Sequence, residues 1–143
     1  MEIRTIGVVG AGQMGNGIAH VAAQAGFDVV MRDVEDAFVE KGLATIDKNL
    51  QRGVDKGKIE AADKAAILER VTGTTALGHL SACDLVVEAI VENLEAKTRL
   101  FASLDEITRD EIILATNTSS IAVTQIAAAT KRPDRVIGMH FMN

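Results

Sequence analysis

The sequence predicts an α/β fold with a doubly wound parallel sheet in three layers, α/β/α. Two observations carry this prediction. Apolar runs of strand length alternate with segments of helical composition along all 143 residues, and no repeat, linker or low-complexity segment interrupts them. Strands that alternate with helices form parallel sheets, because each helix carries the chain back across one face of the sheet. A chain of this length corresponds to one domain, residues 1–143.

The first half of the chain is expected to form two strands and three helices. Ile3–Val9 and Val29–Arg32 are apolar, β-branched runs of strand length. Helices are expected at Met14–Ala25, Val34–Lys56 and Ala61–Arg70. The second of these is long, and its apolar residues recur at helical spacing to mark one buried stripe: Val39, Leu43, Ile46, Leu50 and Val54.

The second half repeats the alternation with shorter elements. Four further strands are expected at Val71–Thr74, Leu85–Ala89, Ile112–Thr116 and Val136–Phe141, and two helices at Leu94–Thr108 and Val123–Ala129. In doubly wound sheets, ligands bind outside the carboxyl ends of the strands. We therefore expect the functional residues directly after each strand.

Composition narrows the partner to a small molecule. The formal net charge is −5 and no basic block is present, which argues against nucleic acid and against a polybasic membrane anchor. No apolar stretch approaches the ~18–20 residues of a membrane span, and the N-terminus is itself a strand. We expect a cytoplasmic location. Cys83, His20 and His79 lack neighbours at metal-ligand spacing, so no metal site is indicated and Cys83 is expected to be a small buried hydrophobe.

The segment from Gly10 to Gly15, GAGQMG, lies where the first strand turns into a helix. In a G-x-G-x-x-G turn the first glycine takes the bend, the second lets the backbone approach a pyrophosphate, and the third lets the helix pack on its strand. The helix N-terminus offers free N–H groups to the phosphates. The turn thus predicts a Rossmann-type dinucleotide site with these cofactor-binding candidates: Gly10, Gly12, Gln13, Met14 (through its backbone) and Gly15. A glycine-rich turn without a ligand is the alternative.

Asp33 ends the second apolar run, at the distance expected for a carboxylate that hydrogen-bonds an adenosine ribose. This favours NAD as the cofactor. An NADP site would favour a small residue at this position followed by an arginine. Here Arg32 precedes Asp33, and neighbouring side chains of a strand point in opposite directions.

The long helix also carries a polar arc away from its buried stripe. Asn49, Arg52 and Lys56 are spaced at i, i+3 and i+7, so they share one side of the helix. Near the cofactor end of the molecule, such an arc would hold substrate phosphates. The alternative is an ordinary solvated face, since Asp47, Asp55 and Glu60 lie close by.

Three later segments carry a family resemblance: LVVEAIVENL at Leu85–Leu94, NTSSI at Asn117–Ile121, and GMHFMN at Gly138–Asn143. Together with the glycine turn, they make the chain resemble the 3-hydroxyacyl-CoA dehydrogenases over its whole length. The short-chain members that act on 3-hydroxybutyryl-CoA are the most similar. The resemblance implies that the protein interconverts an L-3-hydroxyacyl-CoA and the 3-ketoacyl-CoA by hydride transfer with NAD.

The resemblance also implies roles for individual residues. His140 matches the catalytic histidine, and Ser119 matches a serine that contacts the substrate near the reacting oxygen. From its sequence context alone, Ser119 would suit the N-cap of a helix beginning near Ile121. Further matches to cofactor-binding positions are Ala89, Ile90, Glu92, Lys97, Asn117, Ser119 and Asn143. Matches to coenzyme A contacts are Asn49 and Lys56, with Arg52 on the same arc.

One departure from the family pattern bears on activity. Family members continue past the histidine with a glutamate that orients the imidazole and with a helical domain through which they form homodimers, whereas this sequence ends at Asn143. We expect a chain that binds NAD but does not turn over acyl-CoA alone. The alternatives are the domain of an NADP-linked β-hydroxyacid dehydrogenase and a stand-alone NAD-binding module.

Overall fold

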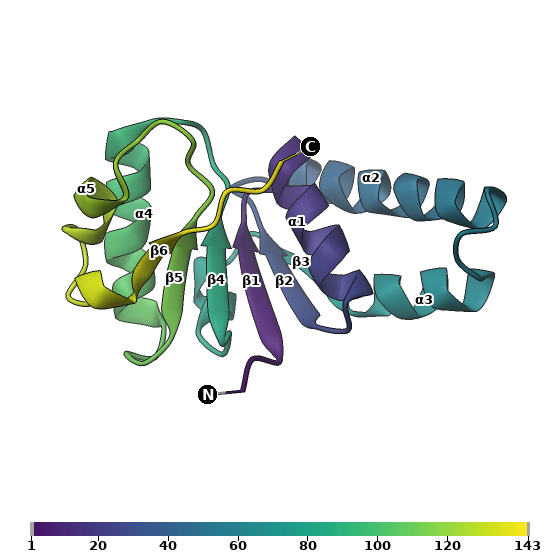
Figure 1. Cartoon of the computed structure of the whole chain (residues 1–143), viewed down its shortest axis with the longest axis horizontal. Helices are drawn as coiled ribbons and strands as arrows, with labels where there is room; N and C mark the ends of the chain where they lie inside the picture. The colour runs from purple at the N-terminus through teal and green to yellow at the C-terminus, as the bar shows by residue number, and fades with distance from the viewer. Residues whose placement is uncertain (1, 143) are drawn as a thin grey trace.

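The computed structural model describes residues 2–142, which contain one six-stranded sheet with all strands parallel (Figure 1). The strand order is β3-β2-β1-β4-β5-β6, so the chain begins near the middle of the sheet and builds outward to each edge in turn. This is the order of dinucleotide-binding Rossmann folds. The strands are β1 Thr5–Val9, β2 Asp28–Arg32, β3 Val71–Thr74, β4 Leu85–Glu88, β5 Ile113–Thr116 and β6 Val136–Gly138.

Helices cover both faces of the sheet and give the expected three layers. Figure 1 shows α1, α2 and α3 grouped on one side of the strands and α4 and α5 on the other. Two short 3₁₀ turns, η1 Leu77–Leu80 and η2 Pro133–Arg135, were not expected from the sequence. The helices are α1 Gln13–Gln24, α2 Asp36–Asp55, α3 Ala61–Glu69, α4 Leu94–Ile107 and α5 Val123–Ala127.

Each face of the sheet has its own apolar core. Strand alternation divides the residues: in β4, Val87 packs under α1, α2 and α3, whereas Val86 packs under α4 and α5. The α2 stripe follows the prediction, with Val39, Ile46 and Leu50 buried and Leu43 and Val54 partly buried. The two cores are why the central strands are apolar on both sides.

All the predicted elements are present, and the largest difference, three residues, lies at the end of β6, while β1, α2 and α5 differ by two residues at one end. β6 ends at Gly138 rather than Phe141, because the N–H of Phe141 donates to the side-chain Oδ1 of Asn117 (2.7 Å) instead of continuing the ladder. β1 begins at Thr5 rather than Ile3. The carboxylate of Asp84 accepts the N–H group of Arg4 (2.9 Å) and so occupies that backbone before the strand begins.

Two expectations from composition can be compared with residues 2–142. No helix in this range has the length and apolar character that crossing a bilayer requires. The same residues contain no group of three or more His, Cys, Asp or Glu side chains placed to hold a metal ion. Cys83 is buried as expected, and burial raises the pKa of its thiol to about 11, which keeps it protonated at neutral pH.

Candidate functional site

The site lies where β1 and β4 are neighbours in the sheet. The chain leaves these two strands toward opposite faces, since α1 follows β1 on one face and α4 follows β4 on the other. At such a switch point the loops diverge and leave a crevice outside the carboxyl ends of the strands. Two adjoining pockets of about 780 Å³ and 350 Å³ occupy this crevice, and Ala89 and Ile90 border both of them.

The larger pocket, here called the glycine-turn pocket, is lined by the turn between β1 and α1. Gly10 has a φ of +111°, which a side chain would strain, and a Cβ on Gly15 would lie 1.8 Å from the carbonyl oxygen of Gly10. A Cβ on Gly12 would meet nothing within 4 Å and would project into open space. The absence of a side chain at Gly12 therefore leaves room for a ligand against the backbone.

The N-terminus of α1 points its free backbone donors at the same pocket. Gly12 is the N-cap and no side chain caps this helix end, whereas Asn93 caps α4 by accepting the N–H of Ala96 (2.9 Å). Gln13 and Asn16 line the pocket beside the turn. An uncapped helix N-terminus with a positive dipole end is a binding site for phosphate groups. The residues present thus fit a dinucleotide pyrophosphate.

Asp33 lies at the rim of the glycine-turn pocket, directly after β2. Its Oδ2 accepts the N–H of Ala11 (2.8 Å) and its Oδ1 accepts the N–H of Val34 (2.7 Å). Each carboxylate oxygen has a second lone pair that remains available to a ribose hydroxyl. Arg32 also lines this pocket, but its Nε donates to the carbonyl oxygen of Thr75 (3.0 Å).

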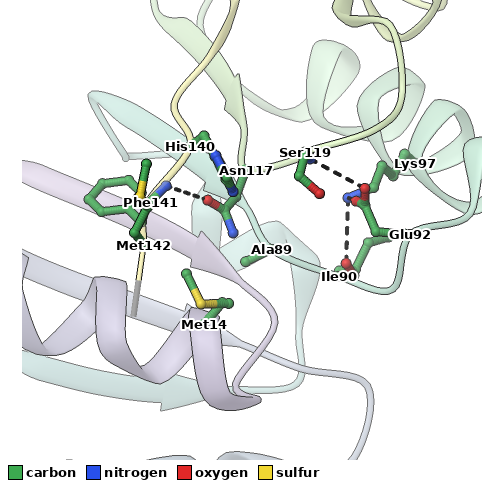
Figure 2. A pocket seen from close by; sticks show the side chains of 10 residues that line it. All are labelled: Met14, Ala89, Ile90, Glu92, Lys97, Asn117, Ser119, His140, Phe141 and Met142. Carbon is green, nitrogen blue, oxygen red and sulfur yellow. Dashed lines mark hydrogen bonds and ion pairs between the residues drawn. The ribbon is translucent and has the colours of Figure 1, made fainter.

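The smaller pocket, here called the histidine pocket, is where several loops converge. Figure 2 shows α1, the loop after β4, the loop after β5 and the segment after β6 each contributing side chains to it. His140 and Ser119 are both exposed here, so both side chains are accessible to a ligand. The lining residues are Met14, Ala89, Ile90, Glu92, Lys97, Asn117, Ser119, His140, Phe141 and Met142.

Asn117 holds the backbone on which His140 is carried. Its main-chain N–H donates to the carbonyl of Glu88 (2.8 Å), which fixes it to the end of β4. Its side-chain Oδ1 accepts the N–H of Phe141, the residue after His140 (Figure 2). Sequence reasoning placed Asn117 near the cofactor but did not foresee this contact. The segment after β6 is thus fixed by a side chain once the sheet ladder has ended.

A charged cluster of Lys97, Glu88 and Glu92 forms part of the wall of the histidine pocket, with Glu88 beneath the two lining residues. The ammonium of Lys97 is hydrogen-bonded to the Oε2 of Glu88, lies 3.1 Å from the Oε1 of Glu92, and donates to the carbonyl of Ile90 (3.4 Å). The side chains of Lys97 and Glu88 are only 1% and 0% exposed. All three N–H groups of the ammonium therefore have partners within the protein.

Glu88 was not identified by sequence reasoning. It is the last residue of β4, and it pairs in register with Thr116 of β5, whose hydroxyl donates to its Oε1 (2.5 Å). A signal for it was available in the sequence, because Glu88 follows Leu85-Val86-Val87 in a strand that is buried on both faces. A charge at such a position requires a partner.

Glu92 connects this cluster to the loop after β5. Its Oε2 accepts the hydroxyl of Thr118 (2.9 Å), the N–H of Ser119 (3.3 Å) and the hydroxyl of Ser120 (2.8 Å). Partial burial acts to raise the pKa of Glu92. The hydrogen bonds from Lys97, Ser120 and Thr118 and the charge of Lys97 outweigh burial and lower the pKa to about 2. Glu92 is therefore ionised throughout the neutral range.

The interpretation of Ser119 as a helix N-cap is wrong. α5 begins at Val123, its N-cap is Ala122, and no side chain caps it. The hydroxyl of Thr118 instead accepts the N–H of Ile121 (3.0 Å) in the turn before the helix. The side chain of Ser119 lies in the lining of the histidine pocket (Figure 2).

The residues predicted to contact coenzyme A are not brought to either pocket. Asn49, Arg52 and Lys56 are exposed, as expected for the polar arc of α2. α2 begins beside Asp33 and Lys56 is its C-cap, so Lys56 lies roughly 30 Å along the helix axis from the first residue of α2. Arg52 lines a separate shallow groove with Asp47 and Asp55.

The other candidate residues from the sequence lie in or beside the two pockets, apart from His20, His79 and Asn143. Asn143 lies outside the described residues. Gly10, Gly12, Gln13 and Asp33 line the glycine-turn pocket, while Met14 lines the histidine pocket and Gly15 is buried beneath the turn. His20 lies on α1 and lines neither pocket, and His79 is exposed in η1 with its Nδ1 2.6 Å from the hydroxyl of Thr74.

Known proteins are similar to this chain in sequence and in fold. A 3-hydroxybutyryl-CoA dehydrogenase of Bradyrhizobium diazoefficiens is 50% identical over 141 residues, which are 99% of this chain and 48% of that protein. A probable 3-hydroxybutyryl-CoA dehydrogenase of Bacillus subtilis is 50% identical over 143 residues, covering 100% of this chain and 50% of the relative. The chain spans about half the length of these curated relatives.

Solved structures of 3-hydroxybutyryl-CoA dehydrogenases have the same fold as this chain. The crystal structure of an (S)-3-hydroxybutyryl-CoA dehydrogenase from Ralstonia eutropha superposes with a TM-score of 0.97 at 49% identity, over 99% of this chain and 50% of that one. Residues 5–143 match the family model described as "3-hydroxyacyl-CoA dehydrogenase, NAD binding domain". The glycine turn, the strand order and the match over nearly the whole chain lead to one conclusion: this chain belongs to the 3-hydroxyacyl-CoA dehydrogenase family and is its NAD-binding domain.

Proposed function

We propose that this domain holds NAD for hydride exchange with carbon 3 of a short-chain L-3-hydroxyacyl-CoA such as 3-hydroxybutyryl-CoA. The observation that carries the proposal is the continuity of the two pockets. The glycine-turn pocket offers a phosphate cradle and a ribose carboxylate, and it adjoins a pocket that presents His140 and Ser119. A ligand that spans both pockets reaches from Asp33 to the histidine.

Binding of the cofactor uses groups already in place. The uncapped N-terminus of α1 and the open backbone at Gly12 accept the pyrophosphate, and the carboxylate of Asp33 accepts the adenosine ribose hydroxyls. NAD, when bound, supplies the hydride acceptor. The part of the site beside Ala89, Ile90, Glu92 and Lys97 surrounds the nicotinamide half in this proposal.

His140 acts as the general base in this proposal. Hydride departure from carbon 3 requires that the hydroxyl proton be removed, and the imidazole of His140 takes that proton and returns it in the reverse direction. Ser119 donates a hydrogen bond to the reacting oxygen, which orients the substrate. Asn117 fixes the backbone beside His140 and so helps to set the position of the imidazole.

The coenzyme A part of the substrate lies outside both pockets in this proposal. Asn49, Arg52 and Lys56 remain predicted contacts, and their exposure on the outer part of α2 leaves them free to meet a long ligand. An ammonium suits phosphate oxygens as a point charge, so Lys56 is the best candidate of the three. The homodimer implied by the resemblance and the cytoplasmic location expected from the sequence also stay predictions.

The proposal is tested in the full-length enzyme by following NADH formation from 3-hydroxybutyryl-CoA. We expect His140→Gln to lower kcat by roughly 10²- to 10⁴-fold, because it removes the proton acceptor. The Kd for NAD should change little, since pyrophosphate and ribose binding do not involve His140. His79→Gln is the matched control and should leave kcat unchanged, because His79 lies in η1 and lines neither pocket.

The result that contradicts the proposal is also specific. Unaltered turnover in His140→Gln would remove this residue from the chemistry. Absence of NADH formation in the unmutated enzyme, with NAD bound, would exclude 3-hydroxybutyryl-CoA as the substrate and overturn the proposal.

A further inference from the structure

Glu88 is a buried charge that the proposed chemistry does not use. It lies at the end of β4 on the face of the sheet covered by α4, and it lines neither pocket. Both of its carboxylate oxygens are occupied, Oε1 by the hydroxyl of Thr116 and Oε2 by the N–H of Ile90 (2.8 Å) and the ammonium of Lys97. A buried carboxylate whose two oxygens both accept hydrogen bonds within the protein is not available to a ligand. Its effect is on the positions of the residues that it binds.

The contacts of Glu88 continue to the surface of the histidine pocket. Lys97 bridges from Glu88 to Glu92, and Glu92 binds the backbone N–H of Ser119 and the hydroxyl of Ser120. The backbone pairing of β4 and β5 ends where the N–H of Asn117 donates to the carbonyl of Glu88. Beyond that point, the side chain of Glu92 joins the two loops.

The position of Glu92 depends on Glu88, because both carboxylates pair with the single ammonium of Lys97. Lys97 is buried, and a buried ammonium that loses one of two carboxylate partners reorganises toward the other. That movement shifts Glu92, whose Oε2 holds the Ser119 turn at one border of the histidine pocket. Asp33, Gly12 and Gln13 line the other pocket, and the hydrogen bonds of Asp33 do not include Glu88, Lys97 or Glu92, although Ile90 borders both pockets.

We propose that Glu88 is a positioning residue for the nicotinamide half of the site, acting through Lys97 and Glu92 on the Ser119 turn. This inference rests on the proposed function. Glu88 lies outside both pockets and acts on the nicotinamide half of the site only. Its replacement should therefore weaken binding of NAD but not of a ligand that lacks the nicotinamide.

The test compares two ligands in Glu88→Gln by isothermal titration calorimetry. Glutamine keeps the size of the side chain, its oxygen still accepts the Ile90 N–H, and its amide can donate to the Thr116 hydroxyl. The probes are NAD and ADP-ribose, which lacks the nicotinamide. We expect NAD affinity to fall roughly tenfold, as for outer-shell partners of binding groups, and ADP-ribose affinity to stay unchanged.

Two further variants separate positioning from general stability. Asp105→Asn is the matched control, because Asp105 is also a largely buried carboxylate on an ion pair, with Arg132, at the opposite end of α4. It should lower the free energy of unfolding and leave both affinities unchanged. Lys97→Met should repeat the selective loss, and Glu88→Gln combined with Lys97→Met should add nothing further, because both act through one contact.

Equal losses of NAD and ADP-ribose affinity in Glu88→Gln would overturn the inference and leave the proposed function standing. The same holds if NAD affinity does not change. If Glu88→Gln does not fold, the two affinities of Thr116→Val decide by the same criterion, because the Thr116 hydroxyl binds Glu88 and Thr116 lines neither pocket. An unmutated chain that binds ADP-ribose but gains nothing from the nicotinamide would overturn both the inference and the proposed function.

Discussion

The carboxylate of Asp33 both holds the backbone of two loops and lines the glycine-turn pocket. Its two oxygens hold the N–H groups of Ala11, inside the glycine turn, and of Val34, at the start of the next loop. Its negative charge would also repel a phosphate on the adenosine ribose. Arg32 lines the same pocket, so a cationic partner for such a phosphate is already nearby.

Asp33→Ala is therefore expected to relax the choice of cofactor. The unmutated chain should bind NAD more tightly than NADP, and the variant should lose NAD affinity while the difference between the two cofactors shrinks. Titration calorimetry with both cofactors measures this. Asp33→Asn keeps one acceptor oxygen for the backbone but no charge, so it should show the same relaxed choice. Equal affinities for NAD and NADP in the unmutated chain would contradict the assignment of NAD.

Glu92 makes the contribution of the β4–α4 loop to the free energy of unfolding depend on pH. Its pKa is lowered from 4.5 to about 2, so the folded state favours the ionised form. The resulting stabilisation is fully present above pH 4.5 and is lost as the pH falls through about 2. We expect the difference in unfolding free energy between the unmutated chain and Glu92→Gln to shrink over this range.

Denaturant unfolding at several pH values measures that difference. The effect should be small, because the side chain of Glu92 is 41% exposed and solvent screens it. Glu95→Gln is the control, since Glu95 is exposed on α4 and has no contact with Lys97 or with the loop after β5. A difference for Glu92→Gln that stays constant with pH would contradict the assignment of its low pKa to these contacts.

Residues of this site could be predicted where their spacing along the chain is local. The glycine turn and Asp33 are recognised by their positions relative to one strand end each, and the structure gathers them in one pocket. Glu88 stood out as a charge in a buried strand, but its partner Thr116 could not be predicted, because it is set by the register between two strands. Asn117 was a candidate from the sequence, but its contact with Phe141 was not predictable, because it depends on where β6 ends.

At the scale of one element, the C-terminal end of α4 is held by a single side chain. All five N–H groups of Arg132 have acceptors: the Oδ1 of Asp105 and the carbonyls of Asp105, Thr108, Arg109 and Ile112. These carbonyls lie in or just after the last turn of the helix, where no intrahelical donor is available. Arg132 is itself buried.

Arg132→Leu is expected to lower the free energy of unfolding by about 3–5 kcal/mol, because it leaves the charge of Asp105 unpaired and several carbonyls without donors. Arg132→Lys should recover only part of the loss, since an ammonium cannot reproduce the planar fork of five donors. Urea denaturation measures both.

Arg135→Leu is the matched control for this element. Arg135 is exposed, and its side chain donates one hydrogen bond, from Nη1 to the carbonyl of Glu111 (3.1 Å), so the loss of this side chain should change the free energy of unfolding by less than about 1 kcal/mol. A small effect in Arg132→Leu, equal to that in Arg135→Leu, would show that α4 does not depend on this cap.

The elements themselves followed from periodicity, and their ends did not. Alternating apolar runs and helical stripes depend on neighbours within one segment, so each strand and helix was foreseen. The ends of β1 and β6 differ from expectation because Asp84 and Asn117, far away in the chain, take up backbone N–H groups there. Such contacts are invisible to any pattern within the segment.

For the whole molecule, the alternation of elements predicts the parallel sheet and its two covered faces, and the strand order places the site between β1 and β4. The position of the polar arc on α2 was not predictable in the same way. It depends on how far a helix of 20 residues extends from the strand that precedes it. Figure 1 shows α2 and α3 reaching beyond the sheet on that side.

The contact between β1 and β4 has a consequence for how the chain folds. It pairs Ile6 with Leu85, a longer separation than any other strand pair within residues 2–142. Closing so long a loop is the most demanding step in chain entropy and slows folding. The crevice that receives the dinucleotide exists only after this closure, so ligand binding reports on a completed fold and draws the folding equilibrium toward it.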